Sequence, residues 1–391
     1  MVYDVVVIGA GPAGCAAALT LAKAGLSAGL FDKAVFPRDK TCGDALIPDA
    51  FQALKKLGLL QRVIGSSYPT HGMRLFSCDG SEVLIRAHGA CMPRPKLDEL
   101  LLNSAIEAGA RFLPGHDFAG MLDEDEKIYR VEFDAGGEIV SARARWVLLA
   151  TGAHPAPIAR AGLLLRAECS SFAVRQYVRN ERLAKGFNEL VFAFDTAVKG
   201  GYGWVFPGPD AVFNIGIGFF GSAHKHNNPR RHYERFIAKF PLARELMRDG
   251  EMVGPLKGAP LRTGLSGTRF ADGGLLGIGE CIGSTFPLTG EGIGKAMETG
   301  ILAAEAIIAN HDLSRAAAAQ AYTRSIDALQ PKFEAYRKAE FLFNWPYLSN
   351  KLVTHTSKNE HTRSKVEGLV NETVDPTFLS TLSGWRRILF H

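Results

Sequence analysis

The feature that most constrains the fold is a group of glycines that follows the first apolar segment of the chain. The residues from Val5 to Ile8 form a short apolar run, which predicts a buried parallel strand. Gly9, Gly11 and Gly14 follow in the pattern GxGxxG. In a dinucleotide-binding turn the first glycine permits a tight bend, the second lets a pyrophosphate approach the backbone, and the third lets a helix pack closely on the strand.

The next twenty residues continue this pattern. A helix is predicted from Pro12 to Ala24, and its N-terminus, with Ala13, directs free backbone N–H groups toward the phosphates. A second strand is predicted from Ser27 to Phe31 and is followed by Asp32 and Lys33, which complete this part of the predicted cofactor site. The Asp32 carboxylate can accept hydrogen bonds from an unphosphorylated ribose, which indicates FAD or NAD. These residues alone leave both cofactors open.

Composition argues against several classes of protein. The 391 residues are 47% hydrophobic, which is enough for a core in two joined domains. The 45 basic and 40 acidic residues are mixed along the chain, so the net charge of +5 argues against nucleic acid but suits an anionic cofactor, substrate or membrane surface. The six cysteines are scattered, so we expect a reduced, cytoplasmic setting and no metal site. We also expect no secretory signal and no transmembrane helix.

Three later segments narrow the choice of cofactor to FAD. They read FPRDKTCGDALIP (36–48), MPRPKLDELLLNSAIEAGARF (92–112) and LLGIGECIGSTFPLTGEGIGKAMETG (275–300). Together they resemble the p-hydroxybenzoate-hydroxylase-like flavoproteins and, among these, the geranylgeranyl reductase family. The resemblance covers about residues 3–305. It implies a mixed α/β and α+β fold: a Rossmann-like FAD-binding domain, an antiparallel-sheet substrate domain and a helical C-terminus.

The resemblance also gives the late glycine-rich segment a function. In this superfamily the corresponding segment returns to the nucleotide-binding domain, and its acid binds the ribityl chain of FAD. Here Glu280 stands where aspartate is usual. A helix is predicted from Ile293 to Ala309, with its positive end beneath the flavin pyrimidine, although a buried glycine-rich helix is the alternative. The implied cofactor contacts are Glu280, Pro287, Gly290, Glu291, Gly292 and Ile293.

The two earlier segments supply further implied contacts. Cys42 and Gly43 correspond to a Cys-Gly pair that lies near the flavin ring in this family. Cys42 either acts catalytically, by tuning the flavin or by relaying a proton, or is only a small buried residue. Arg38, close to Lys40, either holds phosphate groups or belongs to a solvated turn. Arg94 resembles the family arginine that contacts FAD.

The strand near residue 150 ends differently from that of the hydroxylases in the superfamily. Those enzymes usually carry an Asp-Gly pair there, tied to contacts with FAD and NAD(P)H. This chain has Thr151 and Gly152 after Ala150, which still suits a turn close to the cofactor. The difference weakens any inference about a bound nicotinamide, so NADPH, NADH and ferredoxin all stay open as electron donors.

A strand with aromatic residues at alternate positions forms the predicted substrate side. Tyr202, Trp204 and Phe206 lie in the pattern YxWxFP and face one way. They are either ordinary sheet core or, as the resemblance implies, the border of a long apolar substrate channel, with Tyr202 and Trp204 as candidate catalytic residues. Flavin halogenases carry WxWxIP at the analogous strand, and this sequence differs from it at the first and fifth positions.

The implied activity is that of an FAD-dependent oxidoreductase that reduces C=C bonds of an isoprenoid chain of the geranylgeranyl type. A hydride would pass from flavin N5 to one carbon and a proton to the other. An isolated alkene accepts hydride poorly, so a positioned acid is needed, and the sequence does not identify it. The alternatives are a monooxygenase or halogenase that acts on an aromatic or natural-product substrate, and a flavin electron-transfer protein.

The resemblance also implies a discontinuous domain organisation. The FAD-binding domain is expected to comprise residues 1–75, 90–165 and 265–310, and the substrate sheet residues 76–90 and 166–264.

Residues 311–391 are expected to form a helical region, with two helices separated at Pro331. Phe341, Leu342, Phe343, Trp345, Pro346 and Tyr347 then form an aromatic cluster among basic residues. This cluster either docks onto the parent domain or makes a peripheral membrane contact. The chain ends in another amphipathic fragment, GWRRILFH.

Overall fold

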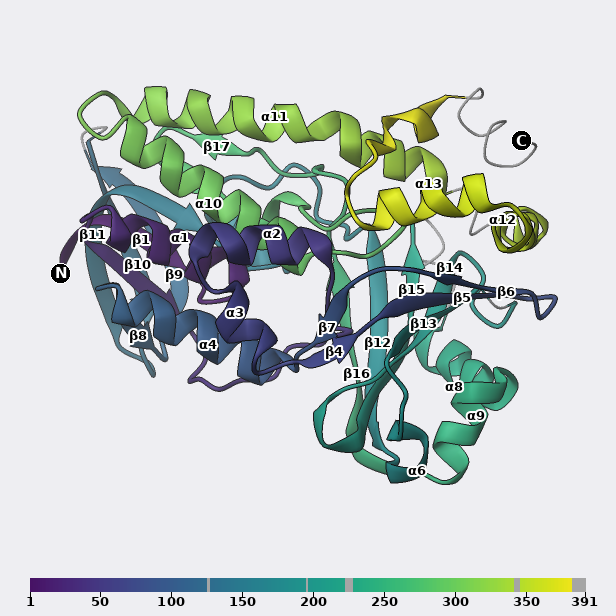
Figure 1. The fold of residues 1–391 in the computed structure, drawn as a ribbon. Coiled ribbons are helices and arrows are strands. Elements are labelled where there is room, and N and C mark those ends of the chain that lie inside the picture. The colour runs from purple at the N-terminus through teal and green to yellow at the C-terminus, as the bar shows by residue number, and fades with distance from the viewer. Residues whose placement is uncertain (125–126, 195, 222–227, 341–344, 382–391) are drawn as a thin grey trace.

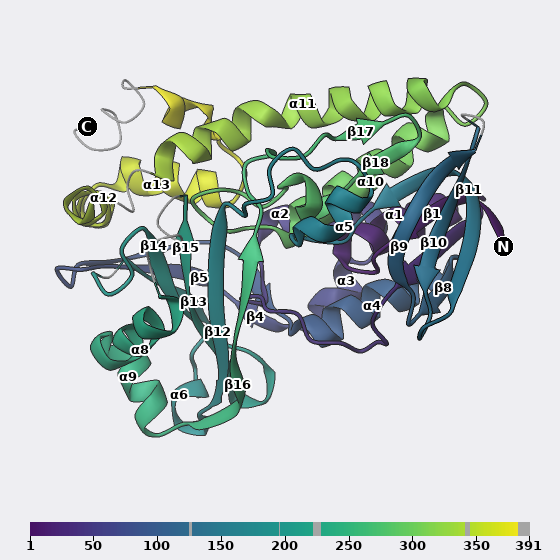
Figure 2. The same cartoon turned by 180° about the vertical axis from the view of Figure 1, so that it is seen from behind.

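The structure is a computed structural model that describes residues 1–391 apart from 125–126, 195, 222–227, 341–344 and 382–391. Two large sheets lie at different ends of the molecule, and long C-terminal helices run along one side of both (Figure 1). The view from behind shows that the longest helix, α11 (Arg315–Ala339), reaches from the first sheet toward the second (Figure 2). The mixed α/β architecture with a helical C-terminus confirms the predicted fold class.

The first sheet has eight strands and a parallel centre. Its main order is β17-β18-β11-β1-β2-β8, and β10 and β9 extend from β11 as antiparallel neighbours. The late strand β18 pairs in parallel with β11, so the late glycine-rich segment does return to this sheet. The strands are β1 (Val2–Ile8), β2 (Ala28–Asp32), β8 (Arg111–Pro114), β9 (Asp117–Glu124), β10 (Ile128–Asp134), β11 (Ile139–Leu149), β17 (Ala271–Asp272) and β18 (Leu275–Gly277).

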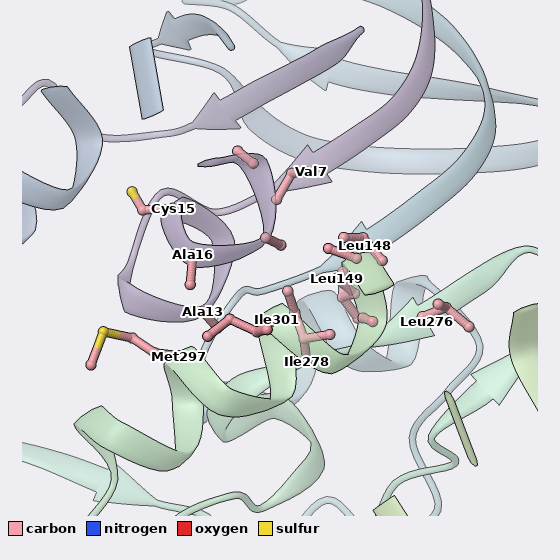
Figure 3. Packing of buried hydrophobic residues seen from close by; sticks show 14 of the residues in the cluster. Val7, Ala13, Cys15, Ala16, Leu148, Leu149, Leu276, Ile278, Met297 and Ile301 are labelled. Atoms are coloured by element: carbon pink, nitrogen blue, oxygen red, sulfur yellow. The ribbon is translucent and has the colours of Figure 1, made fainter. Parts of the chain in front are cut away.

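Two helices of this part, α1 and α10, pack against each other through small residues. Figure 3 shows Ala13 of α1 beside Ile301 of α10, with Leu149 and Ile278 close by. A Cβ added at Gly300 of α10 would lie 2.2 Å from the Ala13 carbonyl oxygen, so glycine allows the two helices to touch. The helices of this part are α1 (Pro12–Lys23), α2 (Pro48–Leu57), α3 (Leu60–Ile64), α4 (Arg94–Glu107), α5 (Pro155–Arg160) and α10 (Ile293–Ala309).

The second sheet has seven strands in the order β16-β12-β15-β14-β13-β5-β6. All of its pairings are antiparallel except the parallel pair β13 and β5. Tyr233 and Phe236 of α8, with Leu246 of α9, pack on one face. The elements are β5 (Gly72–Ser77), β6 (Glu82–Ile85), β12 (Ser171–Arg179), α6 (Glu181–Ala184), β13 (Glu189–Phe194), β14 (Gly201–Phe206), η1 (Pro209–Ala211), β15 (Val212–Phe220), α8 (Pro229–Lys239), α9 (Pro241–Arg248) and β16 (Glu251–Leu261).

A third, small sheet is formed by strands that alternate along the chain with those of the two large sheets. Its order is β3-β7-β4, and both pairings are antiparallel. The strands are β3 (Ala45–Leu46), β4 (Tyr68–Thr70) and β7 (Gly89–Cys91). The loop before β3 carries Cys42 and Gly43, so this sheet fixes the position of a segment that was predicted to face the flavin.

The C-terminal region is helical, but the predicted break at Pro331 is wrong. α11 continues through Pro331 as one helix and is followed by α12 (Pro346–Lys358), α13 (Glu360–Val370) and η4 (Pro376–Ser380). An internal proline costs a helix about 3 kcal/mol or more. Burial of large side chains, each worth about 1.5–3 kcal/mol, exceeds this cost. The buried residues on both sides of the proline include Tyr322, Ile326, Phe333 and Tyr336.

Several sequence-based expectations are left untested by the fold. The domain boundaries stay a prediction, and we note that β5, which begins at Gly72, belongs to the second sheet. Of the aromatic cluster, residues 341–344 lie outside the described residues, as does the whole tail GWRRILFH, while Trp345 and Tyr347 are exposed. The peripheral membrane contact therefore also stays a prediction. Among the described helices, none is both long and apolar enough to cross a bilayer.

Candidate active site

The two large sheets line a cavity of about 690 Å³. Part of the lining lies at or just after the carboxyl ends of β1, β2 and β11, where open α/β sheets bind their ligands. The remainder comes from the loop before β3, from the second sheet and from the residues around the start of α10. The volume is typical of a ligand site, for which about 300–1,000 Å³ is usual.

Most residues predicted for the cofactor and the substrate line this one cavity, although they come from distant parts of the sequence. Gly14 and Pro287 do not line it: Gly14 packs behind the glycine turn, and Pro287 is buried beside Gly264. The roles of the others as ligands stay predictions. The lining includes Gly9, Gly11, Pro12, Ala13, Asp32, Lys33, Arg38, Cys42, Gly43, Arg94, Thr151, Gly152, Tyr202, Trp204, Phe206, Glu280, Gly290, Glu291, Gly292 and Ile293.

The three glycines of the first motif differ in what surrounds them. Gly9 has a φ of +106°, and a Cβ there would lie 2.4 Å from the Ala150 carbonyl oxygen. A Cβ at Gly14 would lie 1.9 Å from the Gly9 carbonyl oxygen. A Cβ at Gly11 would have only the end of the Arg38 side chain within 4 Å, at 3.6 Å. Gly9 and Gly14 are therefore required by the fold, whereas Gly11 keeps open a space beside the N-terminus of α1.

Asp32 ends β2 and holds the glycine turn in place. Its Oδ2 accepts a hydrogen bond from the Ala10 N–H at 2.7 Å, and its Oδ1 accepts one from the Ala34 N–H at 2.8 Å. The side chain is buried but lines the cavity. Since each carboxylate oxygen can accept more than one hydrogen bond, the predicted ribose contact is compatible with this geometry.

Asp98 of α4 holds two arginines beside the glycine turn. Arg94 Nε and Nη2 donate to the two Asp98 oxygens at 2.7 and 2.8 Å, and Arg38 Nη1 lies 3.2 Å from Asp98 Oδ2. Asp98 is fully buried, whereas the Arg38 side chain reaches the cavity. Two guanidinium groups thus share one carboxylate. The three groups together carry one net positive charge, which suits a pyrophosphate.

We expect Asp98→Asn to lower the free energy of unfolding by about 1.5–3 kcal/mol, because hydrogen bonds to charged groups contribute about this much. The amide has one acceptor oxygen and cannot pair with both guanidinium groups. Chemical denaturation of the wild type and the variant measures the difference. Glu107→Gln is the matched control on the same helix, since the ion pair of Glu107 with Arg62 is solvent-exposed, and it should unfold close to the wild type. Equal losses in both variants would argue against the shared carboxylate.

The late segment brings Glu280 and the start of α10 to the cavity. Glu280 lies in η2 (Gly279–Ile282), and its Oε2 is 3.9 Å from Lys40 Nζ. α10 begins at Ile293 after Gly292, which offers no side chain to cap the helix. Its first N–H groups are therefore available to a polar group in the cavity. This arrangement is compatible with the predicted contacts to the ribityl chain and the flavin pyrimidine.

The turn before α10 combines a special backbone with buried acids. Gly290 has a φ of +71°, and a Cβ there would lie 2.9 Å from the Tyr202 hydroxyl oxygen, so both conformation and space require glycine. Glu291 and Asp49 of α2 both line the cavity. Burial raises the pKa of Asp49 to about 7 and raises the pKa of Glu291, and Lys295 partly offsets both effects. The lining therefore includes carboxyl groups that are easily protonated.

Cys42 lies in the loop before β3 and holds its proton. Burial raises the pKa of the Cys42 thiol, and the positive charge of Arg94 only partly opposes this effect. The Cys42 sulfur accepts a hydrogen bond from the Asp44 N–H at 3.4 Å. A thiolate nucleophile is therefore not favoured here, while the predicted influence of Cys42 on the flavin stays a prediction.

The aromatic strand β14 presents its alternate residues to two different surroundings. Tyr202, Trp204 and Phe206 belong to the apolar cluster on the cavity side, whereas Val205 packs in the cluster beneath α8 and α9. The Tyr202 hydroxyl donates to the Thr289 carbonyl at 2.5 Å. The three aromatic side chains therefore form one apolar wall of the cavity, and they face one way as their spacing predicted.

The sequence reasoning missed three residues that are joined to this wall. Trp204 Nε1 donates to Asn214 Oδ1 at 2.9 Å, and Asn214 Nδ2 and the Tyr177 hydroxyl both donate to Asp44 Oδ2, at 2.8 and 2.5 Å. Only Asp44 gave a signal, as a carboxylate directly after the Cys-Gly pair. The cavity is also lined by Ser349 and Leu352 of α12, a region where the family resemblance had faded.

The cavity as a whole fits FAD better than a smaller ligand. One part offers an uncapped helix start, a net positive charge and an acid at the end of β2, and the other part is aromatic. Two hydroxyl oxygens in the lining, Thr151 Oγ1 and Thr289 Oγ1, are buried without a hydrogen-bond partner among the described residues. Buried polar atoms are rarely left unpaired, so these atoms favour a polar ligand next to them.

Comparison with known proteins gives consistent results. Residues 2–249 match the family model described as FAD binding domain. The chain is 32% identical over 332 residues to a menaquinone reductase of Mycolicibacterium smegmatis, a match that covers 77% of this chain and 75% of that protein. It is 30% identical over 312 residues to a digeranylgeranylglycerophospholipid reductase of Methanocaldococcus jannaschii, covering 78% and 76%.

Two solved structures show the same fold at low sequence identity. A geranylgeranyl bacteriochlorophyll reductase-like protein of Thermoplasma acidophilum superposes with a TM-score of 0.79 at 22% identity, covering 99% of this chain and 95% of that one. A flavin-dependent brominase superposes with a TM-score of 0.78 at 20% identity, covering 99% and 100%. Because both a reductase-like protein and a halogenase share it, the fold alone does not determine the reaction.

Proposed function

Because the chain belongs to the geranylgeranyl reductase family of FAD-dependent oxidoreductases, we propose that it saturates C=C bonds in the isoprenoid chain of a lipid. The substrate class is the proposed part, since relatives carry the names of menaquinone reductase and digeranylgeranylglycerophospholipid reductase. The shared chemistry of these named substrates is a long prenyl chain.

The observation that carries this proposal is the apolar wall next to the dinucleotide part of the cavity. Tyr202, Trp204 and Phe206 line it from β14, and Phe192 of β13 and Phe220 of β15 extend it. The rings contact one another, with centroids 5.0–5.5 Å apart for the pairs of Phe192 with Phe206 and with Tyr202. A surface of this kind has few groups to recognise a polar substrate, but it offers contact to successive isoprene units.

The residues of the chain divide into two groups in this proposal. Arg38, Asp32 and the open space at Gly11 would hold the adenine dinucleotide part of FAD, and Glu280 with the start of α10 would hold the ribityl chain and pyrimidine. Reduced FAD supplies a hydride when it is bound. The aromatic wall excludes water and orients the chain, which is most of what a protein adds to cofactor chemistry. NADPH, NADH or ferredoxin is the proposed source of electrons.

Anaerobic turnover tests the proposal. The purified flavoprotein is reduced with dithionite and mixed without oxygen with a geranylgeranyl lipid that has no quinone ring. We expect the flavin to be reoxidised and the lipid to become heavier by two hydrogens for each bond reduced, because the reaction needs no oxygen. Absorbance spectroscopy and mass spectrometry measure the two results.

The choice of lipid removes an ambiguity. A menaquinone also gains two hydrogens when only its ring is reduced, so its mass alone would not locate the reaction. The loss of vinyl proton signals in the NMR spectrum of the product locates it on the chain. A flavin that stays reduced until oxygen is admitted, with oxygen or halogen in the product, would instead support the monooxygenase or halogenase alternative.

A further inference from the structure

Asp44 lies in the cavity wall in an unusual setting. It follows Cys42 and Gly43, has a φ of +66° and is only 3% exposed. Its Oδ2 accepts two hydrogen bonds, from the Tyr177 hydroxyl at 2.5 Å and from Asn214 Nδ2 at 2.8 Å. Tyr177 and Asn214 are direct neighbours across β12 and β15, so the sheet itself brings the two donors together.

Further contacts fix both donors. Asn214 Nδ2 also donates to the Cys42 carbonyl oxygen at 2.7 Å, and Asn214 Oδ1 accepts from Trp204. The Arg175 guanidinium lies 4.0 Å from the centre of the Tyr177 ring. Asp44 therefore has its side chain held in one orientation, as a group that acts on a bound molecule requires.

The second carboxyl oxygen of Asp44 is different from the first. Oδ1 is buried and has no hydrogen-bond partner among the residues that the structure describes, and Asp44 lines the cavity. Since Oδ2 already accepts from two donors, a proton on this carboxyl group belongs on Oδ1. A protonated Oδ1 would be a hydrogen-bond donor without an acceptor among the described residues, on a side chain whose residue lines the cavity.

The surroundings keep the protonated form up to a higher pH than is usual for an aspartate. Burial raises the pKa of Asp44 to about 6, while the hydrogen bonds of Tyr177 and Asn214 and the charges of Arg175 and Arg94 oppose this rise. The titratable groups that face it are Cys42 in the same loop, Cys91 on β7, Arg94 at the start of α4, and Arg175 and Tyr177 on β12.

We propose that Asp44 is the general acid that protonates the substrate alkene. This inference rests on the proposed function and names the acid that the sequence did not identify. One alkene carbon receives a hydride, with its electron pair, from reduced FAD. The other carbon forms a C–H bond with the π electrons and the proton of Oδ1, while the O–H bond breaks and leaves the Asp44 carboxylate. The alkene gains two electrons and FAD loses two, so the step balances.

Asp44→Asn is the principal test variant. Asparagine is among the few residues that accept a positive φ, and its side-chain oxygen can still accept from Tyr177 and Asn214. We expect FAD content near that of the wild type and a rate of flavin reoxidation by a geranylgeranyl lipid that is lower by about 10²–10⁴-fold, the usual contribution of general acid catalysis. The wild-type rate should fall as pH rises through about 6, because only the protonated acid reacts.

Tyr177→Phe tests the assignment through its pH profile. Loss of the tyrosine hydrogen bond removes an effect that lowers the pKa of Asp44, so the fall in rate should move to higher pH. A residue with only a structural role would change the rate without moving the profile. Glu340→Gln is the control, since burial raises the pKa of Glu340 to about 7 but this residue is outside the cavity lining, and it should leave rate and profile unchanged.

Infrared spectroscopy of the oxidised holoenzyme gives a readout that needs no turnover. A carboxylic C=O band should titrate near pH 6 in the wild type and in Glu340→Gln, and should be absent from Asp44→Asn. Absence of this band from the wild type would overturn the assignment, as would an Asp44→Asn variant with the wild-type rate and profile. A variant that loses FAD but keeps its rate per bound FAD would make Asp44 a cofactor ligand instead.

The two proposals fail in distinguishable ways. If the wild type saturates the lipid and Asp44→Asn does so equally fast, the acid is elsewhere and the proposed function stands. If the wild type forms no saturated product, the proposed function fails, and the role of Asp44 as donor to an alkene fails with it. A titrating band lost in Asp44→Asn would then still identify a protonated carboxyl group in the cavity.

Discussion

Gly11→Val should yield a folded protein that is purified without FAD. Gly11 has a φ of −77°, which valine accepts, and a Cβ there would meet only the end of the Arg38 side chain, at 3.6 Å. The protein therefore has room for the larger residue. The branched side chain would, however, occupy the space through which a pyrophosphate approaches the start of α1. We expect a loss of affinity for FAD of at least about a hundredfold, or roughly 3 kcal/mol.

The measurement combines flavin content with a test of folding. The ratio of flavin to protein absorbance gives the occupancy, and chromatography of the cofactor released by heat identifies it as FAD. Gly14→Val is the contrasting variant, because its Cβ would lie 1.9 Å from the Gly9 carbonyl oxygen and should prevent folding rather than only cofactor binding. Full FAD occupancy in a folded Gly11→Val variant would refute the assignment of this site.

The dinucleotide part of the cavity was predictable because its geometry follows from local sequence. The spacing of Gly9, Gly11 and Gly14 determines a strand, a turn and a helix within twenty residues. The predicted helices at 12–24 and 293–309 correspond to α1 and α10, and the predicted strands to β1 and β2. The return of the late segment to this domain did not follow from local spacing but from the resemblance to a family, and its pairing with β11 is seen only in the structure.

The Asp44 network was not predictable because it depends on strand register. Tyr177 and Asn214 are opposite each other only in the observed pairing of β12 with β15, and a shift of one strand by one residue would place them on opposite faces of the sheet. No spacing in the sequence reports that register. Pro331 shows a different reason for a wrong prediction. Proline locally favours a helix break, but the packing of α11 on the core overrides this preference.

Trp204 connects the apolar wall to the Asp44 network, so its loss should affect both. Its ring covers Gly216 of β15, where a Cβ would lie 2.3 Å from Trp204 Cζ2. Its N–H also anchors Asn214. We expect Trp204→Ala to lower stability by about 3–5 kcal/mol, as for other buried tryptophans. We also expect it to lower turnover of a geranylgeranyl lipid by at least about tenfold, or roughly 1.4 kcal/mol, through lost orientation.

Trp204→Phe separates the two effects of this residue. Phenylalanine keeps most of the apolar wall but cannot donate to Asn214 Oδ1, so Asn214 is free to turn and weaken its hold on Asp44. If the wall alone matters, Trp204→Phe should turn over long isoprenoids nearly as fast as the wild type. If the network matters, its rate should fall toward that of Trp204→Ala, and its pH profile should move to higher pH.

In both variants the flavin content should stay near normal, because the tryptophan is predicted to face the substrate. Loss of FAD from a folded variant would place Trp204 in the cofactor site, and unchanged turnover in Trp204→Ala would make the aromatic strand ordinary sheet core.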